Sequence, residues 1–104
     1  MASRREKLES MLQAAPTDQM LRYMLAMELE KEGTHERSLP LFQELMNDDL
    51  PYVPAFLMAG QTLAGLGRIE EAKAVYQTGI SRAEAQGNSH AAGEMAGFLA
   101  ILNE

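Results

Sequence analysis

The sequence matches itself when it is shifted by 34 residues, and this internal repeat is the feature that most restricts its fold. Identical residues fall on each other at five places: Met24 and Met58, Leu29 and Leu63, Gly33 and Gly67, Glu36 and Glu70, and Gln43 and Gln77. Conservative pairs fall between them: Ala26 and Gly60, Phe42 and Tyr76, and Met46 and Ile80. A fixed period of this length is typical of solenoids, in which units stack because no single unit can bury its apolar face alone.

The repeating unit is predicted to be helical. Valine occurs only at Val53 and Val75, and no segment alternates apolar and polar residues as a strand would. Ala, Leu, Met, Glu and Gln are abundant, and apolar residues recur with the helical period. Short breaks in this pattern predict six helices whose neighbours are antiparallel. Their expected bounds are Arg4–Ala14, from Thr17 or Asp18 to Glu32, His35–Asn47, Pro54–Leu66, Ile69–Gln86, and from Asn88 or Ser89 nearly to Glu104.

Capping residues mark the expected helix ends. Ser3 and Glu6 have the spacing of a capping box. Gly33, Gly67 and Gly87 each follow a helical stretch, where a glycine in the left-handed conformation commonly ends a helix. Other N-caps are expected at Thr17 or Asp18, at Thr34, and at Asn88 or Ser89.

This 34-residue helix–turn–helix unit resembles the tetratricopeptide repeat. The second copy carries the pattern at Phe56, Ala59, Gly60, Leu63, Gly67, Ala72 and Tyr76, and the first at Leu25, Ala26, Leu29, Gly33, Ser38 and Phe42. The resemblance implies that Gly60 and Ala72 let paired helices approach closely. It also implies that Phe56, Leu63 and Tyr76 fill the space between hairpins.

Four residues depart from the pattern of that family. Arg22 stands where the repeat usually has a large apolar residue, Gly79 replaces the usual alanine, and Glu84 replaces the usual proline. Pro40 falls inside the third expected helix, where it removes one backbone hydrogen bond.

The resemblance predicts one all-α domain over residues 1–104, a right-handed α-α superhelix of about two and a half hairpins. Residues 1–16 would form the second helix of a truncated repeat, and residues 18–51 and 52–86 the two repeats. Residues 88–104 would form a C-terminal capping helix whose inner face is made by Met95, Phe98, Leu99 and Leu102. The length and the C-terminal sequence also resemble small stand-alone bacterial proteins of this type.

The resemblance further implies a protein-binding function. Tetratricopeptide repeats generally bind a peptide or helix in a concave groove lined by the first helix of each repeat. The expected partner-binding residues are Met20, Tyr23, Met27 and Glu30 in the first repeat, and Leu57 and Gln61 in the second. One subset of the family clamps the terminal carboxylate of chaperones with Lys and Asn. This chain lacks that clamp, since the matching positions hold Tyr23, Met27, Leu57 and Gln61.

Two other functions remain open from the sequence. The chain could be a structural protein that forms a homodimer through the groove or through the C-terminal helix. It could also be an enzyme with an unrecognised site, although we expect no catalytic residue. We also expect Tyr23 to contribute to binding and little to stability.

Composition argues against several classes of partner. The net charge is -6 and the acids and bases are interspersed, so the basic patch of a nucleic-acid-binding protein is absent. No apolar run approaches the length of a membrane span, and no apolar segment of a signal peptide follows the basic N-terminus. The chain has no cysteine, which agrees with a cytoplasmic location.

Motifs for metal or cofactor binding are also missing. His35 and His90 are far apart in sequence and are expected to be solvated. Asn47, Asp48 and Asp49 lack the spacing of a calcium loop, so their acids are expected to keep a connector soluble. Gly60 and Gly65 are not followed by the lysine of a phosphate loop. We therefore expect neither a metal nor a cofactor.

Overall fold

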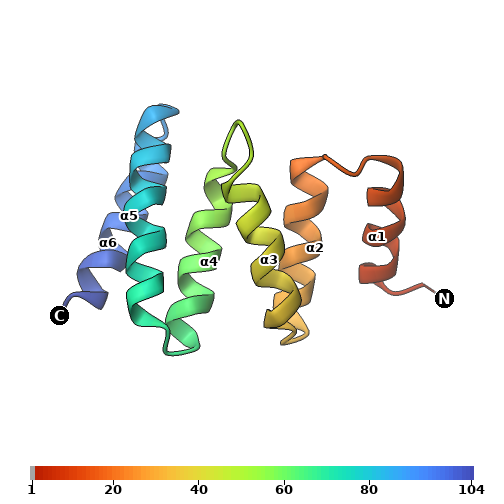
Figure 1. The fold of residues 1–104 in the computed structure, drawn as a ribbon, viewed down its shortest axis with the longest axis horizontal. Coiled ribbons are helices and arrows are strands. Elements are labelled where there is room, and N and C mark those ends of the chain that lie inside the picture. Colours follow the sequence, from red (N-terminus) through yellow and green to blue (C-terminus); the bar gives the residue numbers. More distant parts are fainter. Residues whose placement is uncertain (1) are drawn as a thin grey trace.

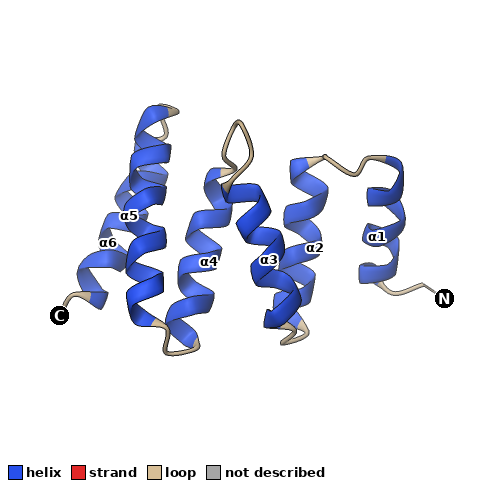
Figure 2. Cartoon of the chain, in the orientation of Figure 1, coloured by secondary structure: helices blue, strands red, loops and turns tan. Residues whose placement is uncertain are grey.

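The computed structural model describes residues 2–104, which fold into six helices that stand side by side in chain order (Figure 1). The helices are α1 (Arg4–Ala14), α2 (Gln19–Lys31), α3 (His35–Met46), α4 (Val53–Gly65), α5 (Ile69–Ala85) and α6 (Ser89–Leu102). All regular structure in this part of the chain is helical (Figure 2). Each helix packs against its chain neighbours, and α4 also contacts α6. The described residues span 46 × 29 × 18 Å, and the termini lie at opposite ends (Figure 1).

The structure confirms the predicted all-α helical-repeat fold, with small differences at the helix ends. The Ser3–Glu6 capping box is complete, with backbone-to-side-chain bonds of 3.0 and 3.1 Å. Asp18, rather than Thr17, caps α2, and Asn88, rather than Ser89, caps α6. Thr34 is the N-cap of α3, but its side chain makes no capping hydrogen bond.

The same turn closes three helices. Gly33, Gly67 and Gly87 have φ angles of +75°, +80° and +74°, which glycine adopts without the steric penalty of a side chain. The residue after each glycine donates its N–H to a carbonyl five residues back, as in a Schellman motif. These bonds join Thr34 to Leu29 (2.9 Å), Arg68 to Leu63 (2.9 Å) and Asn88 to Ala83 (2.8 Å).

Three apolar clusters run along the row of helices. Leu8, Leu25 and Leu29 form the first cluster, between α1 and α2. The second joins α2, α3 and α4 through Ala26, Phe42, Leu45, Ala55 and Ala59, and we call it the central cluster. The third joins α4, α5 and α6 through Val53, Phe56, Tyr76, Ala83, Ala92 and Met95, and we call it the C-terminal cluster. The core is therefore divided among neighbouring helices, as a stacked repeat requires.

Two glycines allow very close helix packing. A Cβ atom on Gly60 would lie 2.3 Å from Cε1 of Tyr76, so the tyrosine ring occupies the space that a side chain would need. A Cβ atom on Gly79 would lie 2.5 Å from the sulfur of Met95. Gly79, a departure from the family pattern, thus makes room for α6. On α6, Met95 is fully buried, while Phe98 stacks on Tyr76 at 6.0 Å and remains partly exposed.

Pro40 does not end α3. The helix continues from His35 to Met46, with the exposed Pro40 near its middle. Proline cannot donate a hydrogen bond to the carbonyl one turn before it. Phe42 and Leu45, which follow it, are both fully buried in the central cluster, so apolar burial holds this part of the chain in place.

Candidate functional site

Two of the expected partner-binding residues line one hollow between α2 and α4. Glu30 lies near the end of α2, and Gln61 lies on the exposed side of α4. The hollow has a volume of about 300 Å³. Its other lining residues are His35, Met58, Thr62, Gly65 and Leu66. We call it the α2–α4 hollow.

Glu30 is the largely buried acid of this hollow. Its side chain is only 15% exposed. The hydroxyl of Ser38 donates a hydrogen bond to Glu30 Oε1 at 2.6 Å, and His35 Nδ1 lies 3.3 Å from each carboxylate oxygen. The expectation that His35 is simply solvated was therefore wrong. The glycine turn at Gly33 brings the first residue of α3 back beside the last turn of α2.

The order of these three side chains differs from that of a catalytic triad. In a triad the serine hydroxyl bonds to the imidazole, which removes its proton, and the carboxylate orients the imidazole. Here the carboxylate of Glu30 is in the middle, and the fully buried Ser38 donates to it directly. The arrangement is therefore not that of a catalytic triad.

Tyr23 and Met27 lie along α2 before the hollow and are half-buried against the central cluster. The Tyr23 ring lies 5.2 Å from that of Tyr52 and 6.1 Å from that of Phe42. Burial, and to a smaller extent Tyr52, raises the pKa of the Tyr23 hydroxyl. Because its ring packs in this way, we now expect Tyr23 to contribute to stability, in contrast to the expectation from the sequence.

The two remaining expected binding residues, Met20 and Leu57, do not line the α2–α4 hollow. Met20, on the first turn of α2, is 63% exposed. On α4, Leu57 packs against the C-terminal cluster, whereas Met58 packs against the central cluster. Gln61 is exposed and lies about one helical turn after both Leu57 and Met58. We use the name α2–α4 face for Met20, Tyr23, Met27 and Glu30 of α2 together with Leu57, Met58 and Gln61 of α4.

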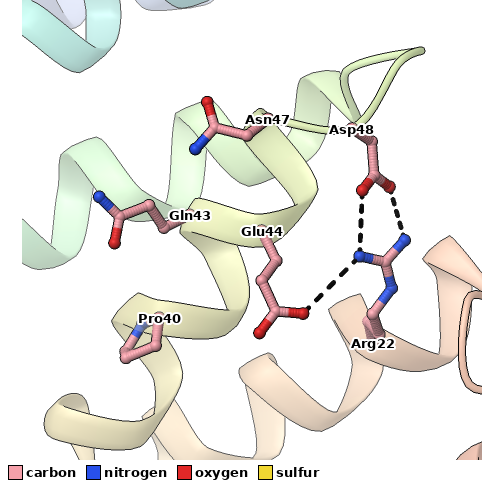
Figure 3. A pocket seen from close by; sticks show the side chains of 6 residues that line it. All are labelled: Arg22, Pro40, Gln43, Glu44, Asn47 and Asp48. Carbon is pink, nitrogen blue, oxygen red and sulfur yellow. Dashed lines mark hydrogen bonds and ion pairs between the residues drawn. The ribbon is translucent and has the colours of Figure 1, made fainter.

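The structure also contains a polar group that the sequence did not predict. The side chain of Arg22 is 10% exposed, and its Nη atoms bond to Asp48 at 3.2 and 2.5 Å and to the carbonyl of Thr17 at 3.0 Å. Glu44 lies 4.0 Å from Arg22, and Arg22, Glu44 and Asp48 line a second hollow, separate from the α2–α4 hollow (Figure 3). Arg22 thus ties α2 to the connector between α3 and α4.

Asp48 is central to this tie. Gln19 donates hydrogen bonds to the Asp48 carboxylate at 2.9 Å and to the carbonyl of Leu50 at 2.7 Å. The bonds from Arg22 and then Gln19 hold the pKa of the Asp48 carboxyl below its ordinary value. The expectation that this acid only keeps the connector soluble was therefore wrong. Arg22 was the sequence signal for this ion pair, because a charged side chain at a repeat position that is usually apolar and buried needs a partner of opposite charge.

Comparison with known proteins identifies the family. No protein-family model matches the sequence, and no curated protein sequence matches it. Solved structures do match. The solution structure of a Bordetella parapertussis protein has a TM-score of 0.82 and 26% identity over 99% of this chain and 90% of that one. A tetratricopeptide repeat domain protein from Salinibacter ruber has a TM-score of 0.79 and 31% identity over 84% of this chain and 88% of that one. This chain belongs to the tetratricopeptide repeat family.

Within this tetratricopeptide repeat protein, the pattern residues that the sequence singled out are mostly buried. Ala26, Phe42, Phe56, Gly60, Leu63, Ala72 and Tyr76 are buried, and Gly33 and Gly67 form the equivalent turns. No helix in residues 2–104 combines the length and apolarity needed to cross a membrane. Across the same residues, no three His, Asp or Glu side chains gather as metal ligands would.

Proposed function

We propose that this tetratricopeptide repeat protein is a non-catalytic interaction module that holds a segment of another protein against the α2–α4 face. The observation that carries the proposal is the α2–α4 hollow, in which Glu30, Gln61 and Met58 come together from two successive repeats. Ligand sites typically combine apolar walls with a few polar groups that fix orientation. The membership of the family, whose fold is generally a protein-interaction fold, supports the same function.

The face offers different contacts along its length. Tyr23, Met27 and Met58 form an apolar surface supported by the central cluster. Thioether side chains are unbranched and polarizable, so this surface can adapt to irregular apolar groups. Glu30 near the end of α2 and Gln61 on α4 add hydrogen-bond acceptors. A bound segment would therefore place apolar side chains beside Tyr23 and Met27 and a polar group beside Glu30.

Selection from a random peptide library displayed on phage tests this function. Selected peptides are synthesised, and their affinities are measured by isothermal titration calorimetry for the wild-type protein and for Met20→Glu and Gln61→Lys variants. We expect each variant to bind at least about tenfold more weakly, a loss of about 1.4 kcal/mol.

Ile101→Glu is the matched control, because Ile101 on α6 is 61% exposed and Met20 is 63% exposed. The control should bind as tightly as the wild type. If peptide affinity is unchanged by Met20→Glu and Gln61→Lys but is reduced by Ile101→Glu, the binding surface lies on α6. A selection that enriches no binding peptide would contradict the proposed function itself.

A further inference from the structure

Glu30 differs from its neighbour Glu28 in how its charge is balanced. Both side chains are 15% exposed. Glu28 lies 3.2 Å from Arg4 and 3.8 Å from Lys31. Glu30 has His35 as its ion-pair partner within residues 2–104, at 3.3 Å. A carboxylate withdrawn from water is costly unless a cation or several hydrogen bonds compensate it. The hydroxyl of Ser38 also donates to Glu30 Oε1 at 2.6 Å, but among residues 2–104 no Arg or Lys pairs with Glu30, whereas Glu28 pairs with one of each.

The α2–α4 hollow leaves room for a further cationic group near Glu30. Its volume is about 300 Å³. The exposed Gln61 lies at the hollow, and its amide oxygen can accept a hydrogen bond. Met58 and the largely exposed Leu66 supply apolar walls. The hollow therefore combines two acceptors with an apolar lining suited to an aliphatic chain.

We propose that the α2–α4 hollow binds an arginine side chain of the partner. This inference rests on the proposed function and names the chemistry at one end of the α2–α4 face. The planar guanidinium presents five N–H donors in a rigid fork and is more weakly hydrated than the ammonium of lysine. It can donate to Glu30 and Gln61 together, while its aliphatic stem packs along Met58 and Leu66. The net charge of -6 also favours the approach of a basic segment.

Titration with blocked arginine, N-acetyl-arginine methylamide, tests the site directly. Backbone amide shifts of the isotope-labelled protein are followed by NMR. Blocked citrulline is the matched probe, because it has nearly the same shape as arginine and no charge. We expect blocked arginine to shift the amides of the residues lining the hollow, with a dissociation constant on the order of millimolar. Blocked citrulline should bind at least about tenfold more weakly.

Two variants test the role of the charge. Glu30→Gln removes the charge and keeps an oxygen that can accept from Ser38, so the fold should persist. It should weaken binding of blocked arginine by at least about tenfold. Glu28→Gln, on the same helix, should leave binding unchanged. Equal shifts by arginine and citrulline, no shifts at the hollow, or an unaffected Glu30→Gln variant would each overturn the arginine site.

The selected peptides separate this inference from the proposed function. If Met20→Glu weakens their binding and Glu30→Gln does not, the α2–α4 face binds peptides but the arginine site is wrong. If neither variant weakens their binding, both proposals are wrong. We expect both variants to weaken binding, and we expect replacement of an arginine in the peptide by citrulline to have the same effect as Glu30→Gln.

Discussion

At the scale of single residues, helix packing depends on glycines at positions that have no space for a side chain. Gly60 is packed so closely against Tyr76 that a Cβ atom would lie 2.3 Å from the ring. A Cβ atom on Gly93, in the exposed part of α6, would meet no other atom within 4 Å. Both glycines lie inside helices, but only at Gly93 is there space for a side chain.

Replacing these glycines by alanine should therefore have opposite effects. We expect Gly60→Ala to destabilise the protein by about 1–3 kcal/mol, because the ring of Tyr76 must shift. Gly93→Ala should stabilise it by up to about 1 kcal/mol, because alanine is the better helix former. Urea unfolding followed by circular dichroism measures both changes. A neutral Gly60→Ala variant would mean that α4 and α5 are less closely packed than the structure describes.

Tyr23 and Tyr76 should contribute unequally to stability. Tyr76 is 1% exposed between α4, α5 and α6, and Tyr76→Ala should cost about 3–5 kcal/mol of unfolding free energy. Tyr23 is half-buried beside Phe42 and Tyr52, and its removal should cost less, about 1–3 kcal/mol. The same urea experiment compares them. Equal losses, or a larger loss for Tyr23, would contradict this description of the core.

At the scale of helices, Arg22 and Asp48 hold α2 against the connector before α4. Asp48→Asn should cost about 2 kcal/mol, because charge-assisted hydrogen bonds to a buried guanidinium are lost. The folded-state pKa of Asp48 is lowered, so this contribution is present above the ordinary aspartate pKa, about 3.9. It is lost as the pH falls through the lowered value.

Unfolding measured across acid pH tests this link. The stability difference between the wild type and Asp48→Asn should shrink as Asp48 becomes protonated. Asp49→Asn is the matched control, because Asp49 is the exposed next residue. The control should lose little stability at any pH. If both variants lose the same stability, Arg22 does not depend on Asp48.

The positions of the helices could be predicted from local sequence patterns, whereas contacts between residues far apart in the sequence could not. The glycines at 33, 67 and 87 fixed three helix ends because few residues other than glycine adopt a positive φ. The effect of Pro40 could not be predicted, since it depends on burial of Phe42 and Leu45 against other helices. The pairing of Arg22 with Asp48 joins residues 26 positions apart, and no local pattern specifies it.

At the scale of the whole molecule, the sequence placed the expected binding residues on two helices but did not show which side chains meet. Glu30 and Gln61 were expected to lie on the binding surface, and they share the α2–α4 hollow. The part played by His35 and Ser38 was missed, because their contact with Glu30 depends on the angle between α2 and α3. Helix periodicity places residues on a face, while helix packing decides how deeply each is buried.

The protein is expected to be a monomer in solution. Among residues 2–104, the most exposed large apolar side chains are Met20 on α2, Leu50 in the connector, and Ile101 on α6. Three side chains on three different elements are far less apolar area than the interface of a stable dimer needs. Light scattering across a hundredfold range of concentration should give the mass of one chain, 11.5 kDa. A dimer that Met20→Glu dissociates would mean that a second copy occupies the α2–α4 face.

The central claim is that a segment of another protein binds along α2 and α4. The most direct measurement is NMR mapping of a selected peptide on the isotope-labelled wild-type protein. We predict that the largest shift changes fall on α2 and α4, from Met20 to Glu30 and from Leu57 to Gln61. Residues on the outer side of α6, including Gly93 and Ile101, should change little. Largest changes on α6, or changes spread evenly over all six helices, would contradict the claim.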